Sequence, residues 1–359
     1  MSRILVGGAG GAPSEGVIRS LLEDDKCEEI IGMGSEPSDL ILSAARVKIC
    51  VPYAVESKYK ESILGILKQE QVHLLHCQND MEILEISKLR SEIKALGVKL
   101  FMPEHGVIDA CVNKFKSYQI WASKGVPVPK SIFINNEHDL KNAFERLGNK
   151  QGNIWLRSTA ISGGGKGALP TNDFEFAKRW INRYNGWGEF SAAEMLSSDT
   201  ITWLSIWFEG ELVVAQTRKR MGWTHGNRTL SGVTGVTKVG ITCSDEKVDA
   251  IARNAICAID KRPHGIYGVD MAYDQNNVPN PTEINISRFF TTILFFTRAG
   301  LNMPKIFKDI ALYGEFPILE KNINPLPNGL MWVRGMDTEP MLVTEKDMVE
   351  RIRGFKKNK

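Results

Sequence analysis

The stretch 266-IYGVDMAYDQNNVPNPTEINISR-288 carries the strongest structural signal in this chain. Its first part, Ile266–Tyr273, is rich in β-branched, aromatic and small apolar residues, which predicts a strand. Thr282–Ile286 predicts a second strand, and the polar residues before it predict a turn over Asn276–Pro279. We therefore expect two neighbouring strands of one sheet in this half of the chain.

Three polar residues on these strands predict a metal site. Glu283 and Asn285 are two residues apart, so both point to the same face of their strand, and Asp270 can face them from the neighbouring strand. Two carboxylates and an amide oxygen are hard ligands suited to Mg²⁺ held together with substrate phosphates. The alternative is a polar outer face of the sheet. Because Asp270 and Glu283 lie inside otherwise apolar strands, where an unpaired charge is costly, we favour the metal site.

The first part of the chain alternates strand and helix patterns, which predicts a parallel, doubly wound α/β unit. The expected strands are Arg3–Gly7, Glu29–Met33, Val47–Val51, Val72–His76 and Val98–Phe101, and the expected helices are Ser14–Leu22 with a serine cap, Tyr59–Glu70 and Met81–Leu96.

The pattern changes after Val107, and we place a domain boundary near residue 112. A helix over Asn113–Lys124 ends at Gly125, and the following Val126-Pro-Val-Pro129 stiffens the exit because proline discourages helix. Later strands and helices predict an antiparallel, helix-backed arrangement. The expected strands are Ser131–Phe133, Asn153–Arg157, Phe190–Leu196, Thr202–Phe208, Glu211–Gln216, Leu330–Arg334 and Met341–Val343, and the expected helices are His138–Leu147, Asp173–Tyr184, one from Ser244 to Arg262, Phe289–Arg298, Pro304–Tyr313 and Glu345–Arg353.

Two glycine-rich segments are candidate phosphate loops. Gly7–Pro13 follows a strand and precedes a helix, but Pro13 stands where a dinucleotide fingerprint needs glycine, and Gly32-Met-Gly34 replaces its acidic residue. A tight turn is therefore favoured there over NAD binding. Ser162-Gly-Gly-Gly-Lys-Gly167 lacks the Walker A spacing, yet such a loop can fold over phosphates, with Lys166 adding charge. Taken singly, a surface hairpin explains it equally well.

A basic segment, Gln216–Arg228, is expected to form a loop together with the glycine-rich residues that follow it. Its residues Arg218, Arg220 and Arg228 are candidates to hold a carboxylate and its acyl phosphate through paired hydrogen bonds. The alternative is a solvated basic hairpin. The turn 78–82 at the carboxyl end of a strand can line the same site, since ligands favour that edge of a parallel sheet.

Composition excludes several classes of function. The 45 basic and 42 acidic residues give a net charge of +3, and the basic run at 356–359 is short, so no nucleic-acid surface is expected. The longest apolar run, Phe289–Phe296, is too short to cross a membrane, and the N-terminus lacks the pattern of a signal peptide. We therefore expect a cytoplasmic protein without a membrane partner. The 6 cysteines are irregularly spaced, which predicts buried, reduced thiols.

Taken in order, these segments resemble the ATP-grasp superfamily, and within it one synthetase unit of the carbamoyl-phosphate synthase large subunit. The resemblance implies an N-terminal doubly wound pre-ATP-grasp domain (1–112) and an α+β ATP-grasp fold whose two subdomains (113–193 and 194–359) clasp ATP. It covers nearly the whole chain, and the ordered set of motifs is more specific than any one of them. They are Asn113-Lys-Phe115, Val126–Pro129, Ile154-Trp-Leu-Arg157, the glycine loop, a hinge strand and Glu283–Arg288.

The resemblance also implies a role for each matching residue. Lys114 and Arg157 correspond to the cationic side chains that hold ATP phosphates, and Arg288, with Arg157, to the arginines that stabilise the transferred phosphoryl group. Asp270, Glu283 and Asn285 correspond to the Mg²⁺ ligands. Asn113 departs from the family's usual aspartate. The remaining nucleotide contacts would be the lid (Gly163, Gly164, Gly165, Lys166 and Gly167), the adenine hinge (Glu194, Met195 and Leu196) and the ribose contact at Asp199 or Thr200.

The activity implied is that of a carboxylate–amine ligase using ATP and Mg²⁺, or Mn²⁺ in its place. Its partners would be a small carboxylate and an amine, and analogy with the family suggests a homodimer. Carbamoyl-phosphate synthase itself needs two synthetase halves, so only its architecture is expected here. The alternatives are a small-molecule kinase of the same fold, a non-catalytic ATP-binding regulatory protein, and, as the weakest, a dehydrogenase.

Overall fold

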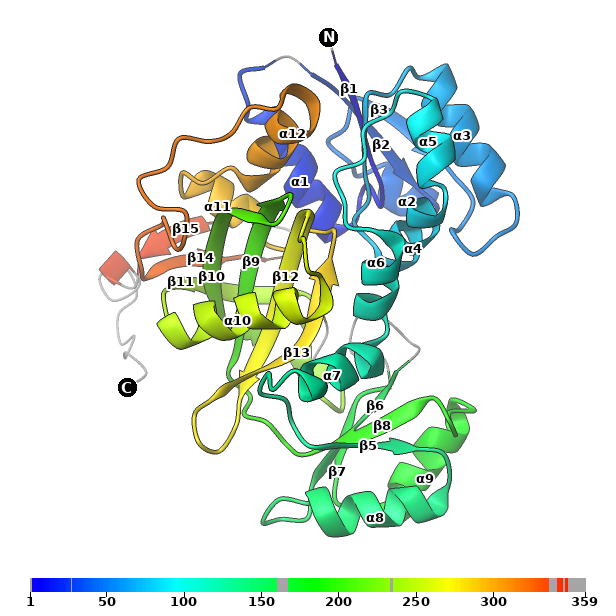
Figure 1. The fold of residues 1–359 in the computed structure, drawn as a ribbon, viewed down its shortest axis with the longest axis vertical. Helices are drawn as coiled ribbons and strands as arrows, with labels where there is room; N and C mark the ends of the chain where they lie inside the picture. The colour runs from blue at the N-terminus through cyan, green and yellow to red at the C-terminus, as the bar shows by residue number, and fades with distance from the viewer. Residues whose placement is uncertain are drawn as a thin grey trace.

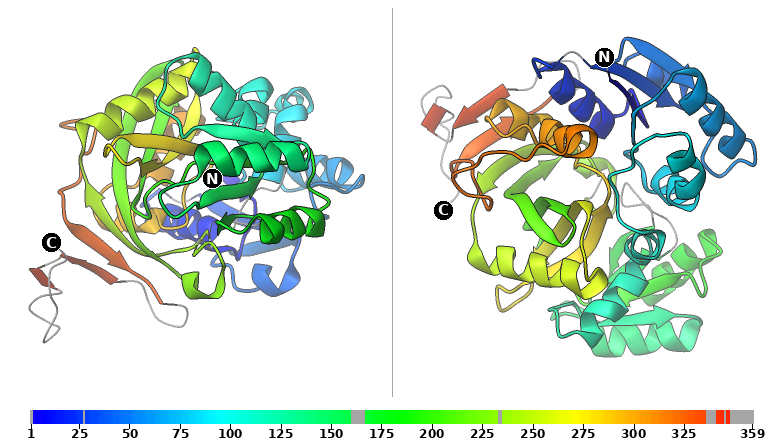
Figure 2. Two further views of the ribbon diagram at one scale, coloured as in Figure 1. Left: turned by 90° about the horizontal axis from the view of Figure 1, so that it is seen from below. Right: turned by 45° about the horizontal axis from the view of Figure 1, so that its top comes forward.

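The computed structural model describes residues 2–26, 28–159, 167–232, 235–335, 341–344 and 346–347. In this part of the chain the strands form three sheets, one parallel and two antiparallel (Figure 1). Helices α6 (His105–Val112) and α7 (Lys114–Ser123) run from the parallel sheet towards the smaller antiparallel sheet (Figures 1 and 2). The predicted combination of a parallel α/β unit with an α+β fold is confirmed.

The N-terminal sheet is parallel, with the strand order β3-β2-β1-β4. Strand order reverses between β1 and β4, which is the position where open α/β sheets place ligands beyond the carboxyl ends of their strands. The strands are β1 (Arg3–Val6), β2 (Glu29–Gly34), β3 (Val47–Cys50) and β4 (Leu74–His76), and the helices are α1 (Ala12–Leu22), α2 (Pro37–Leu40), α3 (Tyr59–Gln69), α4 (Asp80–Lys88) and α5 (Arg90–Ala95).

Local details of this unit differ from expectation. Helix α1 begins at Ala12 with Gly11 as its N-cap, and the Ser14 hydroxyl instead donates to the carbonyl of Gly7 at 2.8 Å. The predicted helix over 81–96 is broken at Leu89 into α4 and α5. The predicted strand over 98–101 is reduced to one isolated bridge to β4, made by Lys99.

A small antiparallel sheet with the order β5-β8-β6-β7 follows α7 and carries two helices. Its core joins apolar side chains of the strands to the inner faces of both helices. The short strand β7 was not predicted, since its central residue is Pro170. The elements are β5 (Ser131–Ile134), α8 (Glu137–Leu147), β6 (Ile154–Ser158), β7 (Leu169–Thr171), α9 (Phe174–Arg183) and β8 (Phe190–Ala193).

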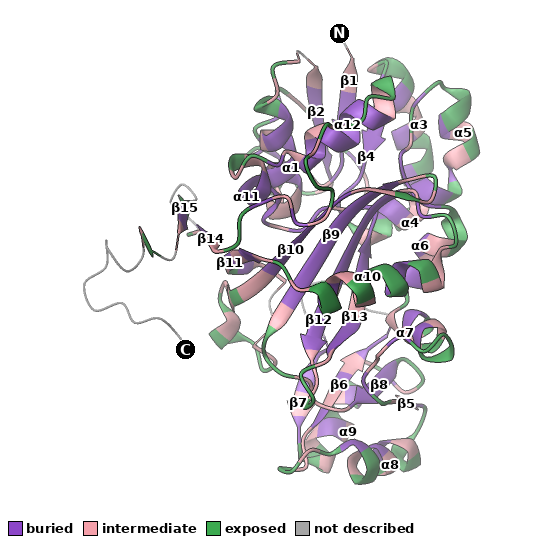
Figure 3. Ribbon diagram, turned by 60° about the vertical axis from the view of Figure 1, so that its left-hand side comes forward, coloured by how far each residue is buried: buried purple, intermediate pink, exposed green. Residues whose placement is uncertain are grey.

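The larger antiparallel sheet has the order β13-β12-β9-β10-β11-β14-β15. Its strand β9 is buried along almost its whole length, as Figure 3 shows, because helix α10 covers one face and α1, α11 and α12 cover the other. The elements are β9 (Thr200–Phe208), β10 (Glu211–Trp223), β11 (Thr237–Cys243), α10 (Glu246–Ile259), β12 (Gly265–Tyr273), β13 (Pro279–Ile286), α11 (Ile293–Arg298), α12 (Met303–Tyr313), β14 (Leu330–Val333) and β15 (Met341–Thr344).

The expected loop over 216–235 is wrong for residues 216–223, whereas residues 224–232 form turns and a short 3₁₀ helix. Strand β10 continues to Trp223 and pairs with both β9 and the unpredicted strand β11. Helix α10 is capped by Asp245 rather than Ser244 and ends at Ile259, and α11 starts at Ile293, later than expected. The helix predicted over 345–353 lies almost entirely outside the described residues.

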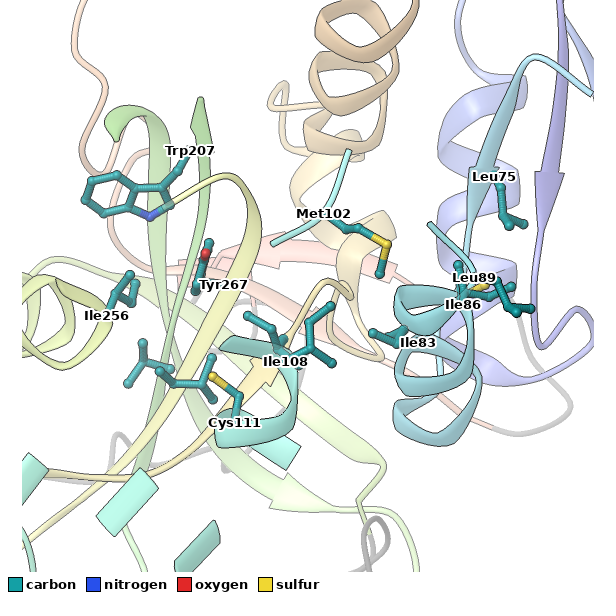
Figure 4. Close-up of a cluster of buried hydrophobic side chains, with 14 of the residues drawn as sticks. Leu75, Ile83, Ile86, Leu89, Met102, Ile108, Cys111, Trp207, Ile256 and Tyr267 are labelled. Carbon is teal, nitrogen blue, oxygen red and sulfur yellow. The ribbon is translucent and has the colours of Figure 1, made fainter. Parts of the chain in front are cut away.

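Buried side chains make the parallel unit continuous with the large sheet. Figure 4 shows Ile83 of α4 and Ile108 and Cys111 of α6 in one apolar cluster that reaches Tyr267 of β12 and Ile256 of α10. Close packing of this kind resists independent movement of the parts that it joins. The three sheets are separate, but this packing makes the parallel unit continuous with the large sheet. The domain boundaries at 112 and 193 therefore remain proposals.

Ion pairs also join helix α12 to the N-terminal part of the chain. Lys308 of α12 is almost fully buried, and its Nζ contacts Glu28 at 2.9 Å, Asp309 at 3.0 Å and also Asp24. Burial lowers the pKa of Lys308, but the hydrogen bonds that it donates to these carboxylates raise the pKa by more, so the net shift is upward. The contacts tie α12 to the segment between α1 and β2.

The burial of the cysteines and the length and apolarity of the helices can be compared with two further expectations from the sequence. Cys77 and Cys111 are buried free thiols, as predicted, but Cys50 and Cys257 are exposed, so the expectation of general burial is wrong. Within the described ranges, no helix combines the length and the apolarity needed to cross a bilayer.

The turn after β1 generates a stability prediction. Gly10 has a φ of +90°, and a Cβ at this position would overlap the carbonyl of Asp39. Gly97 has a φ of +79° but open space around it, so it is a matched control. We expect Gly97→Ala to lower the free energy of unfolding by about 1 kcal/mol through backbone strain. Gly10→Ala should lower it by about 2–4 kcal/mol, because the overlap with the Asp39 carbonyl adds to the strain. Urea unfolding would measure both, and equal losses would contradict this account.

Candidate active site

The predicted metal residues lie together on the large sheet. Asp270 of β12 is the cross-strand partner of Glu283 on β13, and Asn285 donates from its Nδ2 to Asp270 Oδ2 at 3.1 Å. No three His, Cys, Asp or Glu side chains within the described ranges form a metal-binding group. A cation here would therefore be held by two carboxylates and the Asn285 amide oxygen, a donor set that suits Mg²⁺ when phosphate oxygens and water complete it.

Cationic side chains from separate parts of the chain surround Glu283. Lys114 Nζ, at the start of α7, lies 2.5 Å from Glu283 Oε2, and Arg157 Nη1, on β6, donates to the carbonyl of Thr282 at 3.2 Å. Burial by itself raises the pKa of Glu283, but Lys114, Arg288 and Arg157 lower it to about 2. Glu283 is therefore an anion at any physiological pH.

Arg288 forms an ion pair that the sequence did not reveal. Its Nε donates to Asp80 Oδ1 at 2.7 Å and its Nη2 to Asp80 Oδ2 at 3.4 Å. Burial lowers the pKa of Arg288, but Asp80 and Glu283 raise it more, so the guanidinium stays charged. Asp80 is the first residue of α4 and belongs to the turn 78–82.

The same turn holds the segment that follows β13. Gln78 Oε1 accepts from the backbone N–H of Phe289 at 2.8 Å, and Gln78 Nε2 donates to the carbonyl of Pro13 at 3.1 Å. The sequence indicated that this turn can line the site, because it follows a parallel strand, but not which residue would bind Arg288.

Arg218 is buried rather than presented on a loop. It lies on β10 with 1% of its surface exposed, and its guanidinium packs on the Phe290 ring, 4.5 Å from the centroid. It donates to the hydroxyls of Thr202, Thr237 and Thr292. Burial and the neighbouring Arg220 lower the pKa of Arg218 to about 9, while Asp270 opposes the shift.

Two of the three arginines predicted to hold the carboxylate substrate are neighbours, since Arg218 and Arg220 both donate to the Thr237 hydroxyl. Arg220 is held by Thr200 and Thr237, stacks on Trp223 at 3.8 Å and lies 3.7 Å from Asp270. Arg228 is exposed in the short 3₁₀ turn η1 (Gly226–Arg228). Strand β10 carries Arg218 and Arg220 within the sheet, and Arg228 lies beyond the end of this strand, so a shared role for the three in substrate binding stays a prediction.

The predicted lid and hinge are described only in part. Gly163, Gly164, Gly165 and Lys166 lie outside the described residues, whereas Gly167 has a φ of +76° and accepts from Trp180 Nε1 at 3.0 Å.

In the hinge, Glu194 exchanges hydrogen bonds with the backbone of Lys130, and Met195 and Leu196 follow the end of β8. Asp199 is exposed and pairs with Lys219 at 3.3 Å.

The glycine loop after β1 is closed by an acidic side chain. Glu15 accepts from the backbone N–H of Gly10 at 3.0 Å and from that of Ala44 at 2.9 Å. A carboxylate thus occupies a donor that a dinucleotide phosphate would need, and its charge would repel the phosphate. This contact supports a tight turn over NAD binding at the loop.

A surface cavity of about 510 Å³ lies between the β9–β10 turn and the segment after α12, and none of the candidate residues lines it. Its walls are largely apolar, with Phe208, Leu212 and Phe316, and its charged lining residues are the acidic Glu209 and Glu211. Acidic residues repel phosphate, so this cavity does not suit a nucleotide.

A buried carboxyl group beside the glycine loop was also missed. Glu82 is 4% exposed and lies against Gly7, and its carboxylate accepts from the Tyr59 hydroxyl at 3.0 Å and from Asn79 Nδ2 at 3.1 Å. Burial raises the pKa of Glu82 to about 7, although hydrogen bonds from Tyr59, Cys77 and Asn79 oppose the shift. In sequence, Glu82 was visible only as part of the turn 78–82.

Comparisons with known proteins agree with the observed architecture. No protein-family model and no curated protein matches the sequence. The chain is similar to the β-γ-ATP complex of biotin carboxylase from Campylobacter jejuni, at 17% identity and a TM-score of 0.69 over 93% of this chain and 75% of that chain. It is also similar to carboxyaminoimidazole ribonucleotide synthase from Aspergillus clavatus, complexed with ATP, at 16% identity and 0.67 over 92% and 81%. A third similar structure is L-amino acid ligase from Bacillus licheniformis, at 11% identity and 0.66 over 92% and 79%. These likenesses confirm the predicted ATP-grasp fold.

The Glu82 carboxyl generates a prediction of pH dependence. Its pKa is raised from 4.5 to about 7 in the folded chain, so the unfolded chain releases this proton first as pH rises. The stabilisation that the protonated Glu82 carboxyl contributes is fully present below pH 4.5 and is lost as pH rises to about 7. The free energy of unfolding of the wild type, relative to that of Glu82→Gln, should therefore fall by about 3 kcal/mol between pH 4.5 and pH 8. Urea unfolding of both proteins across this pH range would test this prediction. A difference in unfolding free energy that does not change with pH would contradict the raised pKa of Glu82.

Proposed function

We propose that this chain is an ATP- and Mg²⁺-dependent ligase that activates a small carboxylate and joins it to an amine. The observation that carries the proposal is the pairing of Asp270 with Glu283 and Asn285. Three cationic side chains lie around this group: Lys114, Arg157 and Arg288. The ATP-grasp fold supports it, as do the similarity to two proteins solved as ATP complexes and the similarity to an L-amino acid ligase.

The charge balance suits a polyphosphate ligand. Among the ionised side chains described for this site, the cations are more numerous than the anions, so an added anion would lower the electrostatic free energy. The cations are Lys114, Arg157, Arg218, Arg220 and Arg288, and the anions are Asp80, Asp270 and Glu283. Arg157 and Arg288 are rigidly placed by backbone and carboxylate contacts, so they hold phosphate oxygens with little further loss of conformational entropy.

In the proposed reaction a carboxylate oxygen of the substrate attacks the γ-phosphorus of ATP, and the bond to the β,γ-bridging oxygen breaks to release ADP. The amine nitrogen then attacks the acyl carbon, phosphate leaves with the C–O bonding electrons, and the nitrogen loses a proton. Lys114 and Arg157 would hold the phosphates, and Arg288 would stabilise the transferred group. Asp270, Glu283 and Asn285 would hold Mg²⁺, which neutralises phosphate charge when bound.

Substitutions in the site test these roles. Glu283→Gln should lower ADP release at least about 100-fold, because a bound metal contributes several kcal/mol of charge stabilisation. Arg288→Ala should lower it about 1,000-fold or more, as expected for an arginine that stabilises phosphoryl transfer. Glu209→Gln is the control, since Glu209 lies in the turn between β9 and β10 and its side chain forms its described ion pair with Arg262. Near-normal turnover in either site variant, with unchanged thermal unfolding, would remove the assignment.

The reaction class is tested by ADP release with Mg-ATP and a panel of small carboxylates and amines, each alone and in pairs. A ligase should release ADP only with one carboxylate and one amine together, and the product should have the mass of the amide. Release with a single acceptor and a stable phosphorylated product would instead establish a kinase. Binding of Mg-ATP without release across the panel would favour a regulatory protein.

A further inference from the structure

Arg218 is an unusual residue in this sheet, and the proposed reaction does not explain it. It is buried, and in the described part of the chain it forms no ion pair with a carboxylate. Among the residues that the structure describes, none accepts a hydrogen bond from its Nε. A buried charge that contacts no carboxylate directly is costly to keep, so a specific use is expected of it.

Register places Arg218 in line with the metal residues. Arg218 on β10 is the cross-strand partner of Thr202 on β9, and Thr202 is the partner of Asp270 on β12. Asp270 in turn pairs with Glu283 on β13. A row of polar side chains therefore crosses adjacent strands, from the buried arginine to the edge of the sheet.

The hydrogen bonds along this row have only one possible direction. A guanidinium can only donate, and Arg218 Nη2 lies 2.9 Å from Thr202 Oγ1, so the threonine oxygen is the acceptor. The single hydroxyl proton of Thr202 is then directed at Asp270 Oδ1. Asn285 donates to the other carboxylate oxygen. Both oxygens of Asp270 thus receive a hydrogen bond that sets the plane of the carboxylate.

We propose that Arg218 and Thr202 are positioning residues that orient Asp270 to hold the divalent cation. This inference rests on the proposed function, since it takes Asp270 to be a metal ligand. In this proposal, neither Arg218 nor Thr202 contacts the reacting groups. Outer partners of this kind orient metal ligands, and their loss typically weakens metal binding about 10–100-fold.

The competing explanation is that the row only stabilises the fold. Arg218 also holds Thr292, which precedes α11, and packs on Phe290. A merely structural role predicts lower stability without a selective change in metal affinity. The test must therefore measure metal binding itself.

The experiment titrates the full chain with Mn²⁺ in the presence of ADP and follows bound metal by electron paramagnetic resonance. Thr202→Val removes the hydroxyl at constant volume and should weaken Mn²⁺ binding about 10-fold or more. Thr202→Ser restores the hydroxyl and should return the affinity to near the wild-type value. Thr242→Val is the matched control, because Thr242 is an equally buried threonine on β11 whose hydroxyl bonds to the segment 327–330 instead.

A second pair of variants tests the direction of the hydrogen bond. Arg218→Lys keeps a donor-only cation, whereas Arg218→Gln offers an acceptor that lets the Thr202 proton turn away from Asp270. The glutamine variant should bind Mn²⁺ more weakly than the lysine variant, with thermal unfolding recorded for both. This pair also decides the question if Thr202→Val does not fold.

The outcomes separate the two proposals. Wild-type affinity in Thr202→Val, or equal losses in Thr202→Val and Thr242→Val, would overturn the positioning role and leave the proposed function intact. Equal affinities in the lysine and glutamine variants would overturn the directional argument. If the wild type and Asp270→Asn bind Mn²⁺ equally, or neither binds it, the metal assignment fails, and the positioning role fails with it.

Discussion

The register of the large antiparallel sheet is the constraint on which the candidate site depends. Because Asp270 is the direct cross-strand partner of both Glu283 and Thr202, a polar row crosses a sheet whose buried side chains are mostly apolar. A shift of one residue in any strand would turn its polar side chain to the opposite face and bury it among the apolar residues of α10. The aromatic and aliphatic residues that alternate with this row, such as Trp203 and Val269, therefore fix the position of the charges as well as the core.

Contacts from three other segments converge on the end of this row. Lys114 comes from the start of α7, Arg157 from the small sheet, and Asp80 from the carboxyl edge of the parallel sheet. Each contributes or holds a charge, and each reaches β13 or the residues directly after it. The site therefore exists only when all three sheets are assembled, and the apolar cluster around Ile108 that joins the parallel unit to the large sheet supports that assembly.

Two glycine-rich segments in one chain have different physical roles. The loop at Gly10 is rigid, because Glu15 occupies its amide and the carbonyl of Asp39 leaves no room for a side chain. Its glycines serve close packing between the first strand and its neighbours rather than a phosphate. The segment ending at Gly167 follows β6, the strand that carries Arg157, which is consistent with its proposed place over the phosphates.

Local sequence determined the alternation of the first sheet, the strands β12 and β13 and the placing of Glu283 and Asn285 on one face, because these depend on short-range periodicity. The site itself depends on contacts between distant residues. Asp80 and Arg288 are 208 positions apart, and no local pattern signals their ion pair. Arg218 was expected on a loop, as a candidate substrate contact or as part of a solvated hairpin, and only the pairing of β10 with β9 and β11 reveals why it is buried. Periodicity thus decides which residues share a face, whereas tertiary structure decides which charges meet, because the free energy of a buried charge depends on partners that only the assembled sheets bring within reach.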